Sequence, residues 1–257
     1  MPTFLFHDII FGPVISRRLG VSLGVNLLPT SSKFCNFNCI YCECGWTLNR
    51  QSPKFPPREL VNKLLVERLQ ERHANHEPLD VITFAGNGEP TIHPHFPEII
   101  DDVIELRNSI CPTTKVSVLS NATLINKPKI FDALQKIDNN ILKLDSGIED
   151  TINLINQPVT KFSLEKTIEN LRQFKGELTV QTLFFRGKYK GVEIDNTSDK
   201  EVAAWIEAIK KIKPKSVMIY TLDRPTPVKE LYKADEQRLK EIATLVENLG
   251  IKTQING

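Results

Sequence analysis

The sequence lacks the features that mark several common classes of protein. Its 33 lysine and arginine residues are nearly balanced by 31 aspartate and glutamate residues, so the net charge gives no indication of a nucleic-acid partner. Its apolar N-terminal run is interrupted by His7 and Asp8, which leaves it too short and too polar for a signal peptide or a membrane span. We therefore expect a cytoplasmic protein that is not inserted in a membrane.

Internal repeats and low-complexity segments are also lacking. A chain of 257 residues is long enough to bury a substantial core, and barrels of this length commonly form one domain. We expect a single domain over residues 1–257, in which residues 1–20 form an N-terminal extension without a clear period. Residues 186–197, rich in glycine and lysine in their first half, are expected to form a long irregular loop.

Cysteine is scarce, and its distribution is uneven. Cys35, Cys39 and Cys42, which we call the cysteine triad, form a CxxxCxxC array. Three thiolates at this spacing can hold three irons of one [4Fe-4S] cluster, and the remaining iron stays open to a ligand or substrate. Cys44 and Cys111 are expected to be free thiols.

Three other interpretations of the triad stay open at this point. A structural zinc site would use Cys44 as a fourth thiolate, although zinc frameworks usually come as two separated cysteine pairs and the chain has no second pair. A disulfide framework is disfavoured by five cysteines and no secretory leader. A redox-active pair of Cys39 and Cys42 would leave Cys35 without a role.

Strand-like and helix-like apolar patterns alternate along the rest of the chain. Helices are expected after Pro56 and Pro57, behind Ser163 as an N-cap, and from Ser198 with Glu201 as a capping box. Six strand–helix units predict an α/β fold with a parallel sheet and outer helices, either a partial barrel or an open doubly wound sheet. The predicted strands are residues 21–28, 80–84, 115–120, 141–145, 178–184 and 216–221, with a short terminal strand at 251–255.

Polar residues follow several of these strands, at the edge where parallel barrels carry their chemistry. After the second strand, Gly86 and Gly88 let the backbone approach a ligand closely, and Glu89 offers a carboxylate. Taken alone, such a run is usually a tight turn with a solvated acid. The other candidates for cofactor or substrate contacts are Ser120, Asn121, Asp145, Gln181, Asp223 and Arg224.

Two of these motifs together resemble the radical S-adenosylmethionine superfamily. The cysteine triad carries an aromatic residue, Tyr41, just before its last cysteine. The run from Gly86 to Glu89 is similar to the superfamily's glycine-glycine-glutamate motif, although Asn87 stands where the first glycine would be. The resemblance implies a partial (β/α)6 TIM-like barrel, a [4Fe-4S] cluster on the triad, and S-adenosyl-L-methionine chelated at the open iron.

The resemblance also implies roles for the site residues and an activity. Glu89 would bind the amino group of the cofactor, and Ser120 and Asn121 would contact its ribose or carboxylate. The cluster would pass one electron into the sulfonium, and the resulting 5'-deoxyadenosyl radical would abstract hydrogen from a substrate. A one-electron donor such as flavodoxin or ferredoxin is the implied partner of this iron-sulfur oxidoreductase or transferase.

A narrower resemblance covers most of the chain. Residues 12–26 and 220–225 look like the subgroup related to the tRNA wyosine-base synthases, which use pyruvate, a second [4Fe-4S] cluster and a lysine. Apart from the triad the chain has only Cys44 and Cys111, so it cannot hold a second three-cysteine cluster. We expect a single-cluster enzyme that acts on a tRNA base, or on a protein or peptide such as a glycyl-radical enzyme. A non-catalytic zinc-binding module is the alternative from a different class.

Overall fold

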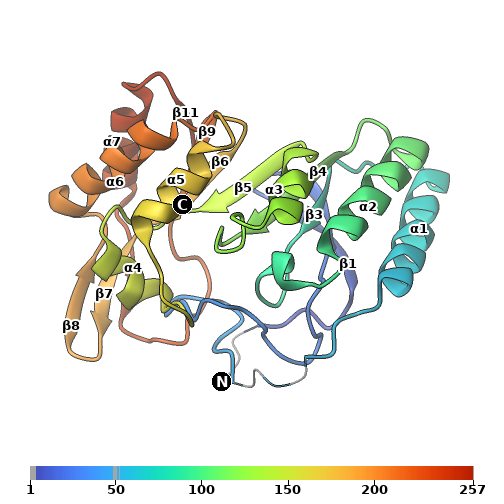
Figure 1. Cartoon of the computed structure of the whole chain (residues 1–257), viewed down its shortest axis with the longest axis horizontal. Coiled ribbons are helices and arrows are strands. Elements are labelled where there is room, and N and C mark those ends of the chain that lie inside the picture. The colour runs from blue at the N-terminus through green and yellow to red at the C-terminus, as the bar shows by residue number, and fades with distance from the viewer. Residues whose placement is uncertain (1–3, 49–50, 52, 257) are drawn as a thin grey trace. The chain divides into compact units, whose positions relative to one another are not determined.

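The computed structural model describes residues 4–48, 51 and 53–256 (Figure 1). Contacts within the chain divide it into two compact units. The N-terminal unit comprises Leu5–Cys35 and Thr47–Asn140, and the C-terminal unit comprises Met1–Phe4, Asn36–Trp46 and Ile141–Gly257. The boundary passes through the cysteine triad, because Cys35 belongs to the N-terminal unit and the other two cysteines belong to the C-terminal unit.

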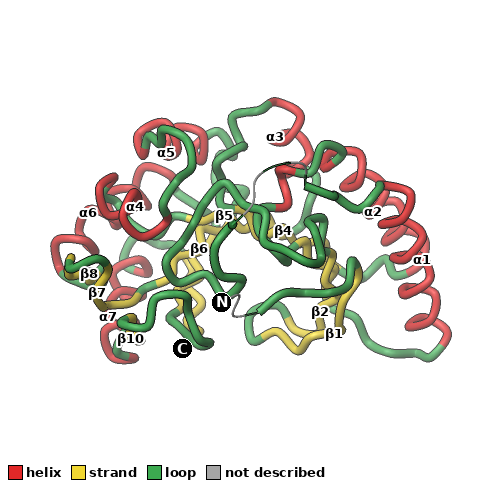
Figure 2. Tube along the Cα trace, turned by 90° about the horizontal axis from the view of Figure 1, so that it is seen from below, coloured by secondary structure: helices red, strands yellow, loops and turns green. Residues whose placement is uncertain are grey.

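The N-terminal unit is built on parallel strands with one antiparallel edge strand. In order across the sheet they are β1 (Ile10–Ser16), β2 (Gly20–Val25), β3 (Val81–Phe84), β4 (Lys115–Ser120) and the start of β5 (Asn139–Lys143). β1 pairs antiparallel with β2, whereas β2, β3 and β4 run parallel. Three helices lie along one side of these strands (Figure 2): α1 (Arg58–Ala74), α2 (Phe96–Ile110) and α3 (Pro128–Gln135).

The C-terminal unit repeats this pattern. The end of β5 is followed across the sheet by β6 (Thr179–Leu183), β9 (Ser216–Tyr220) and β11 (Lys252–Asn256), and all of these pairs are parallel. Its helices are α4 (Glu149–Asn156), α5 (Leu164–Arg172), α6 (Asp199–Ile212) and α7 (Glu236–Glu247). Trp205 anchors α6 to the sheet, because its buried indole N–H donates to the Leu144 carbonyl and the Thr182 hydroxyl, each at 3.1 Å.

The predicted α/β class, with parallel strands and outer helices, is confirmed in both units. The helices form where apolar residues recur at helical spacing, as in α2, whose Phe96, Ile99, Ile100 and Val103 are all fully buried. Among the described residues, no helix is both long and apolar enough to span a lipid bilayer. The single domain over residues 1–257 stays a prediction.

Several elements were not predicted, and one predicted loop is wrong. β1 and α4 were missed, and residues 186–197 form a hairpin of β7 (Phe185–Tyr189) and β8 (Val192–Asp195) instead of an irregular loop. β10 (Leu231–Lys233) pairs with β7 to complete a three-stranded sheet. Gly187 allows this pairing, since a Cβ there would lie 2.1 Å from the Glu230 carbonyl oxygen. A glycine typical of loops is thus required by a close approach between strands.

The predicted capping box of α6 is also wrong, because the side-chain hydrogen bonds expected between Ser198, Glu201 and the helix backbone do not form. Ser198 is the N-cap residue but makes no side-chain hydrogen bond to the helix. Glu201 accepts hydrogen bonds from the hydroxyls of Ser146 (2.6 Å) and Thr151 (2.5 Å), so tertiary contacts replace the local box. The predicted N-cap of α5 is confirmed, because the Ser163 side chain accepts from the backbone N–H of Lys166.

Candidate cofactor site

In the N-terminal unit, the loop after β3 is organised around the carboxylate of Glu89. This side chain is buried, with 2% of its surface exposed. It accepts hydrogen bonds from the Thr91 N–H (3.1 Å) and hydroxyl (2.6 Å), the Ser120 hydroxyl (2.8 Å) and the Asn121 N–H (2.6 Å). The structure therefore joins three of the sequence candidates, Glu89, Ser120 and Asn121, across the carboxyl ends of β3 and β4.

The ionisation of Glu89 is affected both by its burial and by the hydrogen bonds that its carboxylate accepts. Burial raises the pKa of this carboxyl above its usual value, while the hydrogen bonds from Asn121, Thr91 and Ser120 oppose that rise. Oε1 accepts the bonds from Thr91 and Ser120, whereas among the described residues Oε2 accepts a bond from Asn121 alone. Because each carboxylate oxygen offers two lone-pair sites, Oε2 can accept one further donor.

The two glycines of the loop let the chain approach itself closely. Gly86 and Gly88 have φ of 141° and 143°, and a Cβ on Gly88 would lie 1.9 Å from the carbonyl oxygen of Phe34. The backbone N–H of Phe34 donates to Asn87 O at 2.8 Å, and the N–H of Glu89 donates to Phe34 O at 3.3 Å. The glycines thus bring the loop against the residue that precedes Cys35.

Asn87, which departs from the expected glycine, has a structural role that the sequence did not signal. Its side chain is fully buried, and its Nδ2 donates to the carbonyls of Phe6 (2.8 Å) and Pro29 (2.9 Å). Its Oδ1 accepts from the Phe6 N–H at 2.9 Å. A glycine at this position would leave these backbone groups without their partner.

Asn121 contributes to both a turn and the environment of Cys35. Its Oδ1 accepts from the Thr123 N–H (3.1 Å) and hydroxyl (2.7 Å), contacts by which a turn stabilises itself through its own side chains. Its Nδ2 donates to the Cys35 Sγ at 3.6 Å. One residue therefore connects the Glu89 loop to the first cysteine of the triad.

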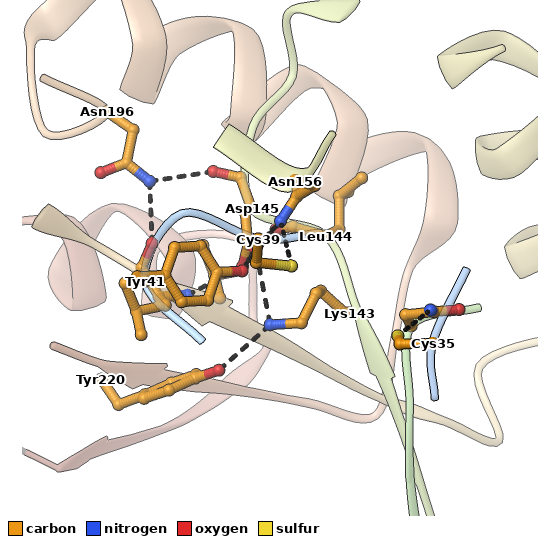
Figure 3. A network of polar contacts seen from close by, with 12 residues as sticks. Cys35, Cys39, Tyr41, Lys143, Leu144, Asp145, Asn156, Asn196 and Tyr220 are labelled. Atoms are coloured by element: carbon orange, nitrogen blue, oxygen red, sulfur yellow. Dashed lines mark hydrogen bonds and ion pairs between the residues drawn. The ribbon is translucent and has the colours of Figure 1, made fainter. Parts of the chain in front are cut away.

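In the C-terminal unit, a buried polar network surrounds Asp145 (Figure 3). The Tyr41 hydroxyl donates to Asp145 Oδ2, and the Asn156 amide donates to the same oxygen at 2.8 Å. The Lys143 ammonium lies 3.5 Å from Asp145 Oδ2 and donates to the Tyr220 hydroxyl at 3.2 Å. The sequence predicted Asp145 as a candidate, but nothing in the spacing pointed to Lys143 or Asn156.

The charges in this network shift the ionisation of its members. Burial, followed by the Asp145 carboxylate, raises the pKa of Tyr41 far above its usual value, so the phenol stays a neutral donor. Burial alone would lower the pKa of Lys143, but the attraction of Asp145 and the hydrogen bond to Tyr220 outweigh it and raise the pKa. The network therefore places the Lys143 ammonium and the neutral Tyr41 phenol beside the Asp145 carboxylate.

The cysteine segment of this unit is held by the end of α4. The carbonyls of Asn156 and Ile155 accept from the backbone N–H groups of Asn38 and Ile40, both at 2.9 Å. Phe37 forms an antiparallel bridge with Pro158. Helix carbonyls in the last turn have no partner within the helix, so α4 can offer them to the segment that carries Cys39.

The loop after β9 contacts the same segment. Arg224 and Asp223 each form an ion pair with a different residue. Arg224 Nη1 lies 2.9 Å from Glu43 Oε2, and Asp223 Oδ1 lies 3.9 Å from Lys233 Nζ. Asp223, Arg224 and Lys233 line a pocket of about 350 Å³. The remaining candidate, Gln181, is buried on β6 beside Lys143 in the parallel register.

None of the five cysteines forms a disulfide. In the part of the chain that the structure describes, no group of three or more His, Cys, Asp or Glu side chains is assembled to hold a metal ion. A [4Fe-4S] cluster takes each thiolate on a different iron, so its ligands need not converge on one point.

Comparison with known proteins gives the family. Residues 30–190 match the model described as the Radical SAM superfamily. A UPF0026 protein of Helicobacter pylori (strain J99) is 33% identical over 238 residues, which cover 90% of this chain and 72% of that relative. The chain therefore belongs to the radical SAM superfamily and, within it, to the UPF0026 family.

Solved structures agree on the fold. A radical SAM methyltransferase from Sphaerobacter thermophilus matches with a TM-score of 0.67 and 15% identity, covering 91% of this chain and 65% of that chain. Archaeal TYW1 matches with a TM-score of 0.53 and 14% identity, covering 88% of this chain and 71% of that chain. These likenesses confirm the predicted partial (β/α)6 barrel. Superfamily membership makes the chain a radical SAM enzyme and implies S-adenosylmethionine and a [4Fe-4S] cluster.

Proposed function

We propose that the cysteine triad holds one [4Fe-4S] cluster and that the Glu89 loop binds S-adenosyl-L-methionine. The observation that carries the proposal is the CxxxCxxC spacing inside the matched residues 30–190. The donor set supports it, because the thiols form no disulfides and the Cys35 and Cys39 sulfurs each accept a hydrogen bond from an asparagine amide. When bound, the cluster and its cofactor supply a radical that abstracts hydrogen from the substrate.

Within this site the Glu89 carboxylate recognises the amino group of the cofactor. Oε2 has capacity for one further donor, and an ammonium donates a charge-assisted hydrogen bond to a carboxylate. Gly86 and Gly88 shape the loop, and Ser120 and Asn121 contact the ribose or carboxylate of the cofactor. Burial around Glu89 strengthens such a bond, since the local dielectric constant is low.

The substrate is a tRNA base, or a protein or peptide such as a glycyl-radical enzyme. Asp145 and Gln181, together with Asp223 and Arg224 of the β9 loop, are the candidate substrate contacts. The electron comes from a one-electron donor such as flavodoxin or ferredoxin, and the cytoplasm is the compartment that suits an oxygen-sensitive cluster. To separate the two substrate classes, 5'-deoxyadenosine formation under dithionite is measured with bulk tRNA and with bulk protein.

Anaerobic reconstitution with iron and sulfide tests the cluster. We expect about four irons per chain, and loss of the cluster when any one cysteine of the triad is changed to alanine. Cys44→Ala and Cys111→Ala are the matched controls and should keep about four irons. Zinc in place of iron in the anaerobically purified protein, or an intact cluster in all three triad variants, would overturn the proposal.

A further inference from the structure

Two sulfurs of the cysteine triad each face the side-chain amide of an asparagine. In the C-terminal unit, Asn156 Nδ2 donates to Cys39 Sγ at 3.4 Å, and in the N-terminal unit Asn121 Nδ2 donates to Cys35 Sγ at 3.6 Å. Asn156 is 1% exposed and Asn121 is 8% exposed. Both sulfurs therefore have a neutral N–H donor within their own unit.

The orientation of the Asn156 amide is set by its neighbours. Asp145 Oδ2 lies 2.8 Å from Asn156 Nδ2, and an ionised carboxylate can only accept hydrogen bonds. Turning the amide over would place its oxygen against that carboxylate, so the donor side faces Asp145 and, with it, Cys39. Lys143, 3.5 Å from the same carboxylate oxygen, balances the charge of Asp145. The Tyr41 hydroxyl, 2.8 Å from Nδ2, shares the remaining hydrogen with the sulfur.

We propose that Asn156 is a positioning residue that raises the reduction potential of the [4Fe-4S] cluster by donating to Cys39; the inference rests on the proposed function. Adding one electron to a cluster increases the negative charge on its sulfur ligands. An N–H donor stabilises that charge, and hydrogen bonds to the sulfurs are among the factors that set cluster potentials. Removing the donor therefore makes the cluster harder to reduce.

Asn156 should have a larger effect than Asn121. Its bond to sulfur is the shorter of the two, and its side chain is more deeply buried. A hydrogen bond in a less polar environment is electrostatically stronger, because less water screens it. The proposal therefore predicts a larger shift in reduction potential for Asn156 than for Asn121. A purely structural role for both residues would not produce this order.

The test is an anaerobic redox titration of the reconstituted protein, in which the EPR signal of the reduced cluster is the readout. We compare wild type, Asn156→Leu and Asn121→Leu. Asn153→Ala is the control, because Asn153 lies on the same helix but is exposed. For Asn156→Leu we expect the ratio of reduced to oxidised cluster at a fixed ambient potential to fall up to about tenfold, or about 59 mV for one electron.

A midpoint potential of Asn156→Leu equal to that of wild type would overturn the inference and leave the proposed function intact. A wild-type protein that takes up no cluster would instead overturn the proposed function. If Asn156→Leu does not fold, pulsed EPR on Asn121→Leu protein labelled with γ-15N asparagine decides. A 15N coupling to the reduced cluster supports the donor at Cys39, and its absence refutes it.

Discussion

Replacing Glu89 probes the Glu89 loop most directly. Glu89→Ala removes the carboxylate that accepts from the backbone N–H groups of Thr91 and Asn121. Losing the acceptor of a buried donor costs about 1–3 kcal/mol, so the free energy of unfolding should fall by about 2–6 kcal/mol. Total stabilities are typically about 5–15 kcal/mol, so this is a large fraction. The hydroxyls of Thr91 and Ser120 add less, because they can rotate toward other acceptors.

Glu89→Gln separates the hydrogen bonds from the charge. Its remaining oxygen can keep the three bonds made by Thr91 and Ser120, while its amide group faces the Asn121 N–H. The hydrogen bond from the Asn121 N–H is lost, at a cost of about 1–3 kcal/mol. Removing a buried charge offsets part of this cost, since burial raises the pKa of Glu89. The stability order is therefore wild type, then Gln, then Ala.

Urea unfolding of the metal-free protein measures the free energy of unfolding of both variants. The control is Glu105→Ala on the exposed face of α2, whose free energy of unfolding should stay within about 0.5 kcal/mol of wild type. If Glu89→Ala unfolds at the wild-type urea concentration, the carboxylate does not organise the loop. Calorimetry on cluster-loaded Glu89→Gln should show affinity for S-adenosylmethionine reduced about tenfold, the effect of losing one charge-assisted hydrogen bond. Unchanged affinity would remove Glu89 from the cofactor site and leave its structural role.

Three further changes follow from individual contacts. Burial lowers the pKa of His93, so the folded state favours its neutral ring. The stability that this neutral ring contributes is present above about pH 6.5 and is lost as the pH falls through the pKa of His93 in the folded state. His93→Gln should reduce this pH dependence, measured by urea titrations at several pH values. Arg224→Ala and Asp223→Ala break exposed ion pairs and should change stability by less than about 1 kcal/mol. With dithionite, both should still form 5'-deoxyadenosine but give less product once a substrate is known; wild-type product yields would exclude a substrate role. Gly187→Ala should destabilise the protein by more than about 1 kcal/mol, because its Cβ would meet the Glu230 carbonyl; a wild-type melting temperature would contradict this contact.

Local patterns in the sequence were sufficient for most of the fold. Strand β4 begins and ends at the predicted residues, because a buried strand needs a continuous apolar pattern. The triad is likewise a local feature, since its cysteines lie within one short segment. β1 was missed because its residues are largely exposed and show no alternation, so only pairing with β2 identifies it as a strand.

The environment of the triad was decided by tertiary structure alone. Asn156 lies 117 positions from Cys39, on a helix too short to give a clear periodic signal. It reaches the cysteine because carbonyls left unpaired at the end of α4 bond the backbone around Asn38 and Ile40. Asn87 likewise deviates from a glycine motif because it holds Phe6 and Pro29, distant in sequence. Spacing along the chain determines which side chains can act as ligands, whereas the donors that surround them come from segments that only folding brings together.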